Sequence, residues 1–191
     1  MTDQNTSGRI EVVHGSMFAG KTEHMISRLR QEARRGRRVR AFKHSMDDRY
    51  DPDHLVTHRQ DRFDAIRVPH AEDLPALSVG YEVIAVDEGH FFKKPLIPVA
   101  IQLRDQGKII IIAGITYDIW GRPFDPLPQL CEIADEIVVK QAPCRVCGNP
   151  APYNLRLTPT DVLHMVGGLD DYEPRCKEHF TPFSTTPPET A

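Results

Sequence analysis

The sequence contains no apolar run long enough to cross a membrane, and residues 1–8 are polar where a signal peptide needs an apolar centre. It also lacks an excess of one charge. The 24 Lys and Arg against 27 Asp and Glu leave a net charge of −3, without the basic surplus of a nucleic-acid-binding surface. Cysteine is scarce: three of the four lie in a metal-binding pattern, which favours a reducing compartment over a disulfide framework. We therefore expect a cytoplasmic protein whose partners include neither a membrane nor a nucleic acid.

Strand-like and helix-like patterns alternate along most of the 191 residues. The expected strands are 9–14, 39–43, 66–68, 81–88, 108–115 and 138–140. The expected helical segments are 23–34, 71–77, 98–106 and 127–134. The alternation predicts an α/β fold with a parallel sheet flanked by helices and joined by right-handed crossovers. The nearly continuous apolar run 108–115 is typical of a central strand buried on both faces.

A glycine-rich stretch after the first expected strand has the form G-x-x-x-x-G-K-[ST]. It consists of Gly15, Ser16, Met17, Phe18, Ala19, Gly20, Lys21 and Thr22. Strand, glycine loop and helix follow one another as a phosphate-binding loop requires, so that backbone N–H groups and the helix N-terminus face phosphate oxygens. Lys21 is placed to reach the β- and γ-phosphates, and the Thr22 hydroxyl to hold Mg²⁺. A chance match in a protein that binds no nucleotide is the alternative, but both flanks favour a P-loop NTPase-type sheet.

The strand expected at 81–88 ends in two acids, Asp87 and Glu88. At the carboxyl edge of a sheet beside a phosphate loop, the aspartate can orient the water shell of Mg²⁺ and the glutamate can act as a general base. The alternative is an acidic pair that faces water. Two other segments stay open: loop 44–52 is either functional or a solvated connector, and the basic run 34–40 is either a solvated helix end or an anion-binding patch.

From residue 141 the chain changes character, because two short Cys/His pairs with the same spacing replace the apolar segments. The pairs are Cys144 with Cys147 and Cys176 with His179. Four such ligands suit a closed, tetrahedral structural Zn²⁺ site. The alternative is four unrelated side chains. The fourth cysteine, Cys131, has helical spacing from its apolar neighbours and is expected to be a small buried residue.

Taken in order, the motifs resemble those of the cellular and bacterial (type II) thymidine kinases, from about Gly8 to Phe180. The markers are the phosphate loop, Asp47-Asp48-Arg49-Tyr50, Asp87-Glu88-Gly89-His90-Phe91-Phe92, Ala113-Gly114-Ile115, Arg122-Pro123-Phe124, the four zinc ligands and Gly167-Gly168-Leu169-Asp170-Asp171-Tyr172. The resemblance implies ATP-dependent phosphorylation of the 5′-hydroxyl of thymidine or deoxyuridine, with Mg²⁺ and a structural Zn²⁺. It also implies a homo-oligomer, commonly a tetramer.

The resemblance assigns roles to individual residues. Glu88 matches the general base, and Arg49 and Lys21 complete the expected catalytic set. The expected Mg²⁺ residues are Thr22, Asp87 and Asp47, and the expected ATP site is the phosphate loop with Asp87, Glu88, Gly89 and His90. The expected nucleoside contacts are Met17, Phe91, Ile115, Phe124, Arg156, Met165 and Tyr172. The family closes the nucleoside under a loop held by its zinc module, and that loop corresponds to 153–172 here.

The chain departs from the family pattern at four positions. His90 stands where glutamine is usual, Thr116 where an aspartate is common, Ile119 where an aromatic ring is common, and Asp125 where glycine is usual. Two alternatives follow: a kinase of the same fold with another nucleoside preference, or a phosphate-loop module without catalysis. The expected organisation is a flexible N-terminus (1–8), a nucleotide-binding domain (9–140), a zinc module with the nucleoside-covering loop (141–180) and a disordered tail (181–191).

Overall fold

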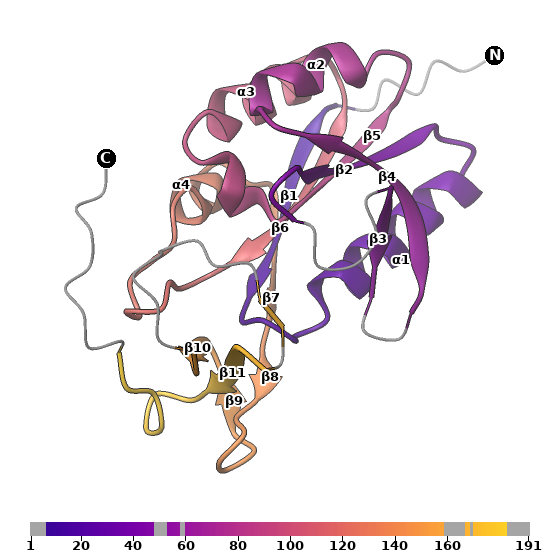
Figure 1. Ribbon diagram of the computed structural model, residues 1–191. Helices are drawn as coiled ribbons and strands as arrows, with labels where there is room; N and C mark the ends of the chain where they lie inside the picture. Colours follow the sequence, from indigo (N-terminus) through magenta and orange to yellow (C-terminus); the bar gives the residue numbers. More distant parts are fainter. Residues whose placement is uncertain (1–6, 48–52, 58–59, 159–166, 169, 183–191) are drawn as a thin grey trace.

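The computed structural model describes residues 7–47, 53–57, 60–158, 167–168 and 170–182. A seven-stranded sheet in the order β3-β4-β2-β5-β6-β1-β7 forms the centre of the molecule (Figure 1). Its strands are β1 (Arg9–Gly15), β2 (Val39–His44), β3 (His54–Val56), β4 (Arg62–Val68), β5 (Val83–Asp87), β6 (Ile109–Ile115) and β7 (Glu136–Lys140). The helices are α1 (Lys21–Arg34), α2 (Leu74–Leu77), α3 (Leu96–Asp105) and α4 (Leu127–Glu132), with 3₁₀ turns η1 (Ala71–Asp73) and η2 (Gly89–Phe92). The expected α/β sheet flanked by helices is confirmed.

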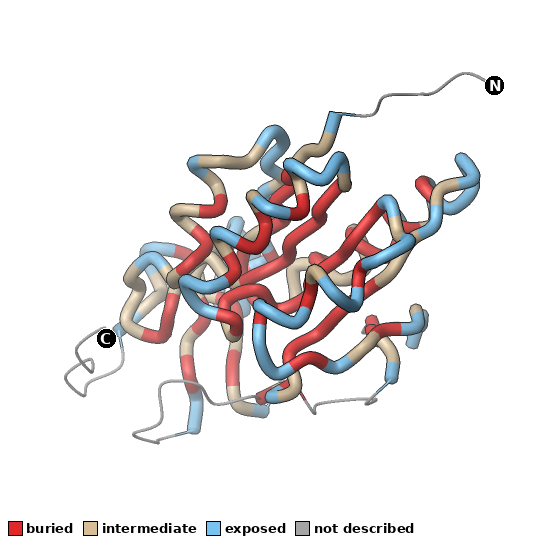
Figure 2. Tube along the Cα trace, turned by 90° about the horizontal axis from the view of Figure 1, so that it is seen from above, coloured by how far each residue is buried: buried red, intermediate tan, exposed pale blue. Residues whose placement is uncertain are grey.

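The alternating side chains of the central strands build two separate cores, one on each face of the sheet. On one face Val13, Ala85 and Ile111 pack against Met25 and Leu29 of α1. On the other face α3 and α4 cover the sheet. The residues packed together there include Ile10, Val12, Ile84, Val86, Ile110, Ile112, Leu96, Leu103, Leu127 and Leu130. Buried segments accordingly run along the central strands in Figure 2.

The strand 109–115 lies between β5 and β1, and both of these pair with it in parallel. All of its residues except the last are buried, which confirms the prediction of a central strand covered on both faces. Parallel pairing directs the carboxyl ends of β1, β2, β5 and β6 to one edge of the sheet. Groups that follow these strands therefore meet at that edge.

One edge of the sheet differs from the sequence-based expectation. No strand was expected between residues 43 and 66, but β3 and the first part of β4 form an antiparallel hairpin there. Leu55 and Ala65 are buried under α1, and this long-range packing stabilises strands whose own sequence is polar. The sheet is thus parallel except for its outermost strand.

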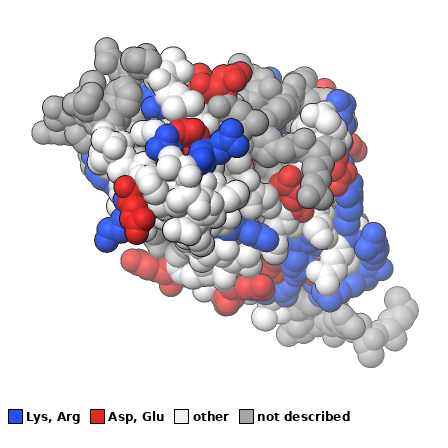
Figure 3. Space-filling view, turned by 90° about the horizontal axis from the view of Figure 1, so that it is seen from below, with Lys and Arg blue, Asp and Glu red and all other residues white. Residues whose placement is uncertain are grey.

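The basic run 34–40 follows α1 and is tied to carboxylates. Arg35 and Arg37 donate to the fully buried Glu32 at 2.9 and 2.6 Å, and Arg28 also contacts it. Arg38 lies 3.6 Å from Glu82. Basic and acidic side chains also occur side by side on the face seen in Figure 3. The paired side chains support the interpretation of a helix end over that of an anion-binding patch.

A small module follows β7 and lies beyond the carboxyl edge of the sheet (Figure 1). It contains two antiparallel pairs, β8 (Ala142–Pro143) with β9 (Pro150–Ala151), and β10 (Tyr153–Arg156) with β11 (Tyr172–Arg175). Two hydrogen bonds join it to the phosphate loop: the Met17 N–H donates to Asn154 Oδ1 at 2.7 Å, and the Ala142 N–H donates to Ser16 Oγ at 3.1 Å. The module therefore contacts the stretch that the sequence singled out.

Cys131 lies outside the module, half-buried against the core that contains Ile10, as expected. Burial raises the pKa of its thiol. Several expectations fall outside the described residues: the flexible N-terminus to residue 6, the roles of Arg49 and Met165, and nearly all of the disordered tail. Among the described helices, none combines the length and the apolar character that a membrane crossing requires.

Candidate active site

The glycine-rich stretch connects the end of β1 to the start of α1. Gly15 is needed there because a Cβ at this position would overlap the carbonyl oxygen of Lys140 on the neighbouring strand. Lys21, the first residue of α1, is buried, and its Nζ donates to the Ser16 carbonyl at 2.7 Å. The loop therefore curls back on its own lysine, which is the geometry that a phosphate-binding loop requires.

The two strand-end acids lie opposite this loop. The Thr22 hydroxyl donates to Asp87 Oδ2 at 3.2 Å, so residues 65 positions apart in the sequence meet at the carboxyl edge of the sheet. Asp87 Oδ1 also accepts the Glu88 N–H at 3.0 Å. A hydroxyl and a carboxylate at this separation are suitable ligands for a Mg²⁺ ion or its bound water.

A pocket lies between the phosphate loop and the ends of β2 and β5. Its lining comprises Met17, Phe18, Ala19, Gly20, Lys21, Thr22, Glu23, Lys43, Asp47, His54, Leu55, Val56, Thr57, Asp87, Glu88 and Gly167. The sequence-predicted Lys21, Thr22, Asp47, Asp87 and Glu88 are thus brought together in one place. Asp47, Asp87 and Glu88 are all buried, so the acidic pair does not face open water.

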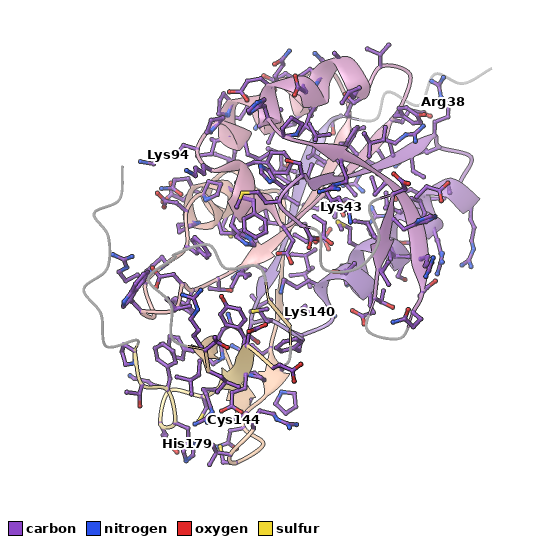
Figure 4. The ribbon with its side chains drawn as sticks, in the orientation of Figure 1. Arg38, Lys43, Lys94, Lys140, Cys144 and His179 are labelled. Carbon is purple, nitrogen blue, oxygen red and sulfur yellow. The ribbon has the colours of Figure 1, made fainter. Side chains whose placement is uncertain are left out.

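Sequence reasoning missed Lys43, which lines the same pocket. It is 2% exposed and pairs in register with Asp87 across β2 and β5. In Figure 4 it lies in the middle of the domain, near the carboxyl ends of these strands. Its place directly after the apolar pair Ala41 and Phe42, at the end of an expected strand, was the available signal. A lysine is almost never fully buried unless its charge is paired.

His90, which replaces the usual glutamine, is 2% exposed and lies among rings. Its ring centroid is 4.3 Å from that of Phe91 and 4.9 Å from that of Phe124. Its Nδ1 is 3.6 Å from Glu88 Oε2. Phe91 and Phe124, two of the expected nucleoside contacts, therefore pack on the histidine that lies beside Glu88, the expected general base.

A second apolar group holds other expected nucleoside contacts. Met17 and Tyr172 are buried in one cluster with Ile119, and Phe18, Ile115 and Trp120 pack against it. The Arg156 guanidinium lies over the Tyr172 ring, 5.8 Å from its centroid. The expected contacts thus form two groups. Phe91 of η2 and Phe124 lie on either side of His90, and the other group lies between the phosphate loop and the small module.

Thr116 is hydrogen-bonded both to the phosphate loop and to Phe124. Its N–H donates to the Gly15 carbonyl at 3.2 Å, and its own carbonyl accepts the Phe124 N–H at 2.9 Å. Its hydroxyl lies 2.8 Å from His14 Nδ1. Burial, and then the charge of Lys21, lower the pKa of His14, so the imidazole is neutral near pH 7. The departure from aspartate therefore leaves a neutral hydrogen-bonded pair beside the phosphate loop.

The four predicted metal ligands converge in the small module, where Figure 4 shows Cys144 and His179 close together. Their ligand atoms all lie within 4.8 Å of one another. The separations include 3.6 Å between the sulfurs of Cys147 and Cys176, and 3.1 and 3.9 Å from His179 Nδ1 to the sulfurs of Cys176 and Cys144. Tetrahedral Zn²⁺ with ordinary bond lengths needs ligand separations of roughly 3.5–3.8 Å, so the residues fit the ion.

The pKa of the Cys144 thiol is lowered, which favours the thiolate form. It is buried, and burial alone would raise its pKa. Hydrogen bonds from the backbone N–H groups of Cys176, Cys147 and Val146 outweigh burial and lower the pKa of Cys144 to about 6. A thiolate is the form that binds Zn²⁺.

Comparison with known proteins agrees with this geometry. The family model described as thymidine kinase matches residues 8–180. A thymidine kinase from Rhodothermus sp. (strain ITI 518) is 40% identical over 175 residues, which cover 92% of this chain and 82% of that protein. A thymidine kinase from Porphyromonas gingivalis is 38% identical over 188 residues, covering 98% and 92%. A third, from Bdellovibrio bacteriovorus, is 38% identical over 179 residues, covering 93% and 88%. With a phosphate loop, strand-end acids and a Cys₃His cluster placed as described, the chain belongs to the thymidine kinase family.

Proposed function

We propose that this kinase transfers the γ-phosphoryl group of ATP to the 5′-hydroxyl of thymidine, or of deoxyuridine, and releases the nucleoside monophosphate. The observation that carries the proposal is the single pocket in which Lys21 and Thr22 face Asp87 and Glu88. A phosphate loop and a carboxylate base in one pocket can hold the transferred phosphoryl group next to an acceptor hydroxyl. The choice of thymidine as the nucleoside follows from the matched family and its named members.

In the proposed reaction Glu88 accepts the proton of the 5′-hydroxyl, whose oxygen forms the new bond to phosphorus as the bond to the β-phosphate oxygen breaks. Lys21 binds the β- and γ-phosphates and stabilises the charge that moves onto the leaving ADP. Thr22, Asp87 and Asp47 would hold Mg²⁺, which neutralises phosphate charge when bound. Arg49 would contact the transferred group.

The nucleoside base would lie between the ring group of Phe91 and Phe124 and the cluster of Met17 and Tyr172. A pyrimidine offers a flat face to such apolar walls. Ile115, Arg156 and Met165 would complete the site. The Cys₃His cluster would hold a structural Zn²⁺ that keeps β10 and β11 beside the phosphate loop.

We assign residues 9–140 to the nucleotide-binding domain and 141–180 to the zinc module, in a cytoplasmic homotetramer. Support for assembly comes from β7 at the edge of the sheet, where Ile137 and Val139 are 46% and 57% exposed. An unpaired strand edge with apolar side chains favours association. Sedimentation velocity of the purified protein tests this directly, because a monomer at micromolar concentration would contradict it.

The test of the proposed function is ATP turnover with thymidine, deoxyuridine, deoxycytidine and no nucleoside, in the wild type and in Glu88→Gln. Thymidine-dependent formation of the monophosphate is expected. Glu88→Gln should keep ATP binding and lower turnover about 10²- to 10⁴-fold, the usual contribution of a general base. Turnover without nucleoside, or wild-type rates in the variant, would contradict the proposal.

A second candidate is a kinase of the same reaction with another nucleoside preference. The substitutions at Thr116 and Ile119 favour it, because Ile119 belongs to the apolar cluster that contains Met17 and Tyr172, and Thr116 donates to the Gly15 carbonyl of the phosphate loop. Turnover confined to deoxycytidine in the same panel would establish it.

A further inference from the structure

The pocket at the phosphate loop has a wall that the proposed reaction does not use. It consists of the three residues of β3 and the following Thr57, which we call the β3 wall. Most of the other lining residues belong to the phosphate loop, the start of α1 and the ends of β2 and β5. Leu55 of the wall is buried against Met25 and Leu29 of α1, and Figure 1 shows β3 beside this helix. The wall therefore borders the place of the proposed phosphoryl transfer.

Two reciprocal hydrogen bonds join the end of the β3 wall to Asp61. The Thr57 N–H donates to the Asp61 carbonyl at 3.0 Å, and the Asp61 N–H donates to Thr57 Oγ1 at 3.1 Å. The Gln60 N–H donates to the Thr57 carbonyl at 2.9 Å. Thr57 is 1% exposed. Because both the backbone and the side chain of Thr57 bond to Asp61, the position of Asp61 fixes the position of the wall.

The side chain of Asp61 is in turn held by α1. Arg30 Nη1 and Nη2 donate to the two Asp61 carboxylate oxygens, each at 2.6 Å, and Nη2 also donates to the Arg62 carbonyl at 3.2 Å. The hydrogen bond from Arg30 lowers the pKa of the Asp61 carboxyl, so the carboxylate is ionised near pH 7. The two side chains are 42% and 45% exposed. An exposed ion pair usually contributes little to stability, but a bidentate pair also fixes the geometry of its partners.

One helix connects this ion pair to the phosphate loop. Helix α1 begins with Lys21 and Thr22 of that loop and reaches Arg30 about 2.5 turns later. The backbone hydrogen bonds of the helix fix the separation between its two ends. The ion pair between Arg30 and Asp61 therefore sets how the β3 wall lies relative to the residues that would bind phosphate.

We infer that Arg30 and Asp61 are positioning residues, which hold the β3 wall against the pocket so that water does not reach the γ-phosphoryl group. The inference rests on the proposed function for the identity of the acceptor. A kinase excludes water from its site because water competes with the acceptor hydroxyl. In the competing reaction the oxygen of water bonds to the γ-phosphorus as the bond to the β-phosphate oxygen breaks, which yields ADP, inorganic phosphate and a proton.

Removal of the ion pair should shift the reaction toward hydrolysis. The measured quantity is the ratio of phosphate release without nucleoside to formation of thymidine monophosphate with thymidine, on the same protein sample. We expect Asp61→Asn to raise this ratio about 2- to 5-fold, the range that one exposed pair allows. Asp61→Arg, which places two guanidinium groups together, should raise the ratio further. An unchanged ratio in Asp61→Arg would overturn the inference.

A charge swap separates positioning from a general loss of stability. Arg30→Glu combined with Asp61→Arg restores an ion pair between the same two positions, and the ratio should return to within about twofold of the wild type. Asp105→Asn is the matched control, because it removes another exposed ion pair, with Arg104 at 2.9 Å, at the end of α3. The ratio should not change in this control. A ratio that follows the melting temperatures of the variants, and not the charges of the pair, would contradict the assigned role.

Hydrogen exchange tests the position of the wall without catalysis. In protein without any ligand, the amides of residues 54–57 should exchange faster in Asp61→Arg than in the wild type, and the charge swap should slow them again. Unchanged exchange would refute the inference, and so would faster exchange with an unchanged ratio. If the wild type phosphorylates no nucleoside, the proposed function fails. Faster exchange together with increased ATP hydrolysis in Asp61→Arg would still support the role of the pair.

Discussion

Glu88 has a conformation that glutamate rarely adopts. Its φ and ψ are 50° and 46°, in the left-handed region, directly after the last residue of β5. Such a conformation costs about 1–3 kcal/mol and persists only where the surrounding structure fixes it. Here the fixed neighbours are the Asp87 carboxylate, which accepts the Glu88 N–H, and the buried His90. The strain places the proposed base at the turn between strand and 3₁₀ helix.

Lys43 leads to a prediction at the same scale. Its ammonium is buried at the pocket that holds four acids, Glu23, Asp47, Asp87 and Glu88. Removal of the Lys43 charge would leave these carboxylates and the transferred phosphoryl group with less positive charge beside them. We expect Lys43→Met to lower kcat about 10²- to 10³-fold, as removal of one fixed charge-stabilising donor does, with a smaller loss in Lys43→Arg. Steady-state kinetics with ATP and thymidine measure it.

The matched control for Lys43→Met is Lys94→Met. Lys94 has a side chain that is 64% exposed, and Figure 4 shows it at the surface. Its loss should leave turnover within about twofold, because exposed ion pairs contribute little. Equal activity in both variants would remove Lys43 from the proposed site, and a lowered melting temperature in Lys43→Met would identify a structural role instead.

At the scale of elements, α1 is fixed to β1 by charges as well as by its apolar face. Arg28 of α1 donates to Glu11 of β1 at 2.9 Å and contacts Glu32, while Arg9 donates to Glu11 at 2.8 Å. Burial opposes ionisation of Glu32, but the hydrogen bond from Arg28 and the charges of three arginines outweigh it and lower the pKa. The network holds the helix that begins at the phosphate loop.

Because the pKa of Glu32 is lower in the folded state, its ionised carboxylate stabilises the protein near neutral pH and less so in acid. The ionised Glu32 contributes fully to the free energy of unfolding above its ordinary pKa of 4.5. This contribution is lost as the pH falls through the lower pKa of the folded state. Glu32→Gln leaves Arg28 and Arg37, whose side chains are 14% and 19% exposed, without this carboxylate. Because Arg28 keeps its contact with Glu11, the free energy of unfolding at pH 7 should fall about 1–3 kcal/mol. Urea denaturation from pH 7 to 3 should show the two proteins converging below about pH 4.

Glu72→Gln is the control, because Glu72 is exposed in η1. Its effect on the free energy of unfolding should stay within about 0.5 kcal/mol at every pH. A constant difference between Glu32→Gln and the wild type down to pH 3 would contradict the assigned role of the ionised carboxylate.

At the scale of the whole molecule, the small module and the phosphate loop depend on each other. Asn154 of β10 accepts the Met17 N–H at 2.7 Å, and Ser16 accepts the Ala142 N–H at 3.1 Å. The Cys₃His cluster flanks Asn154 in the sequence, and Ala142 lies two residues before Cys144. Loss of a metal from the cluster should therefore affect the proposed ATP-binding loop, although the cluster itself lies in the module.

We expect purified wild-type protein to contain one Zn²⁺ per chain and Cys147→Ser to contain none. Because metal binding and local folding are coupled, hydrogen exchange should accelerate in 142–156 and 172–176. Activity should fall at least about tenfold. Cys131→Ser, which changes a cysteine outside the cluster, should keep the metal. Wild-type protein without zinc by metal analysis would contradict the assignment.

The parts of the site that follow from contiguous residues were predictable. The phosphate loop, the acids that end β5 and the spacing of the cysteines are local, and their chemistry depends on neighbours in the chain. The hairpin of β3 and β4 was not predicted, because its polar sequence becomes a strand only under α1. Lys43 was missed for the same reason: its burial depends on Asp87 lying on the adjacent strand.

The sequence by itself thus determined the alternation of strands and helices, the glycine-rich loop, the Cys₃His cluster and the family, since each depends on short patterns of residue type and spacing. Only the tertiary structure decided that β6 separates β1 from β5, that Thr22 meets Asp87, and that Tyr117 lies against Tyr153 of the module. These contacts join segments far apart in the chain. They depend on how whole elements pack, and no local pattern carries that information.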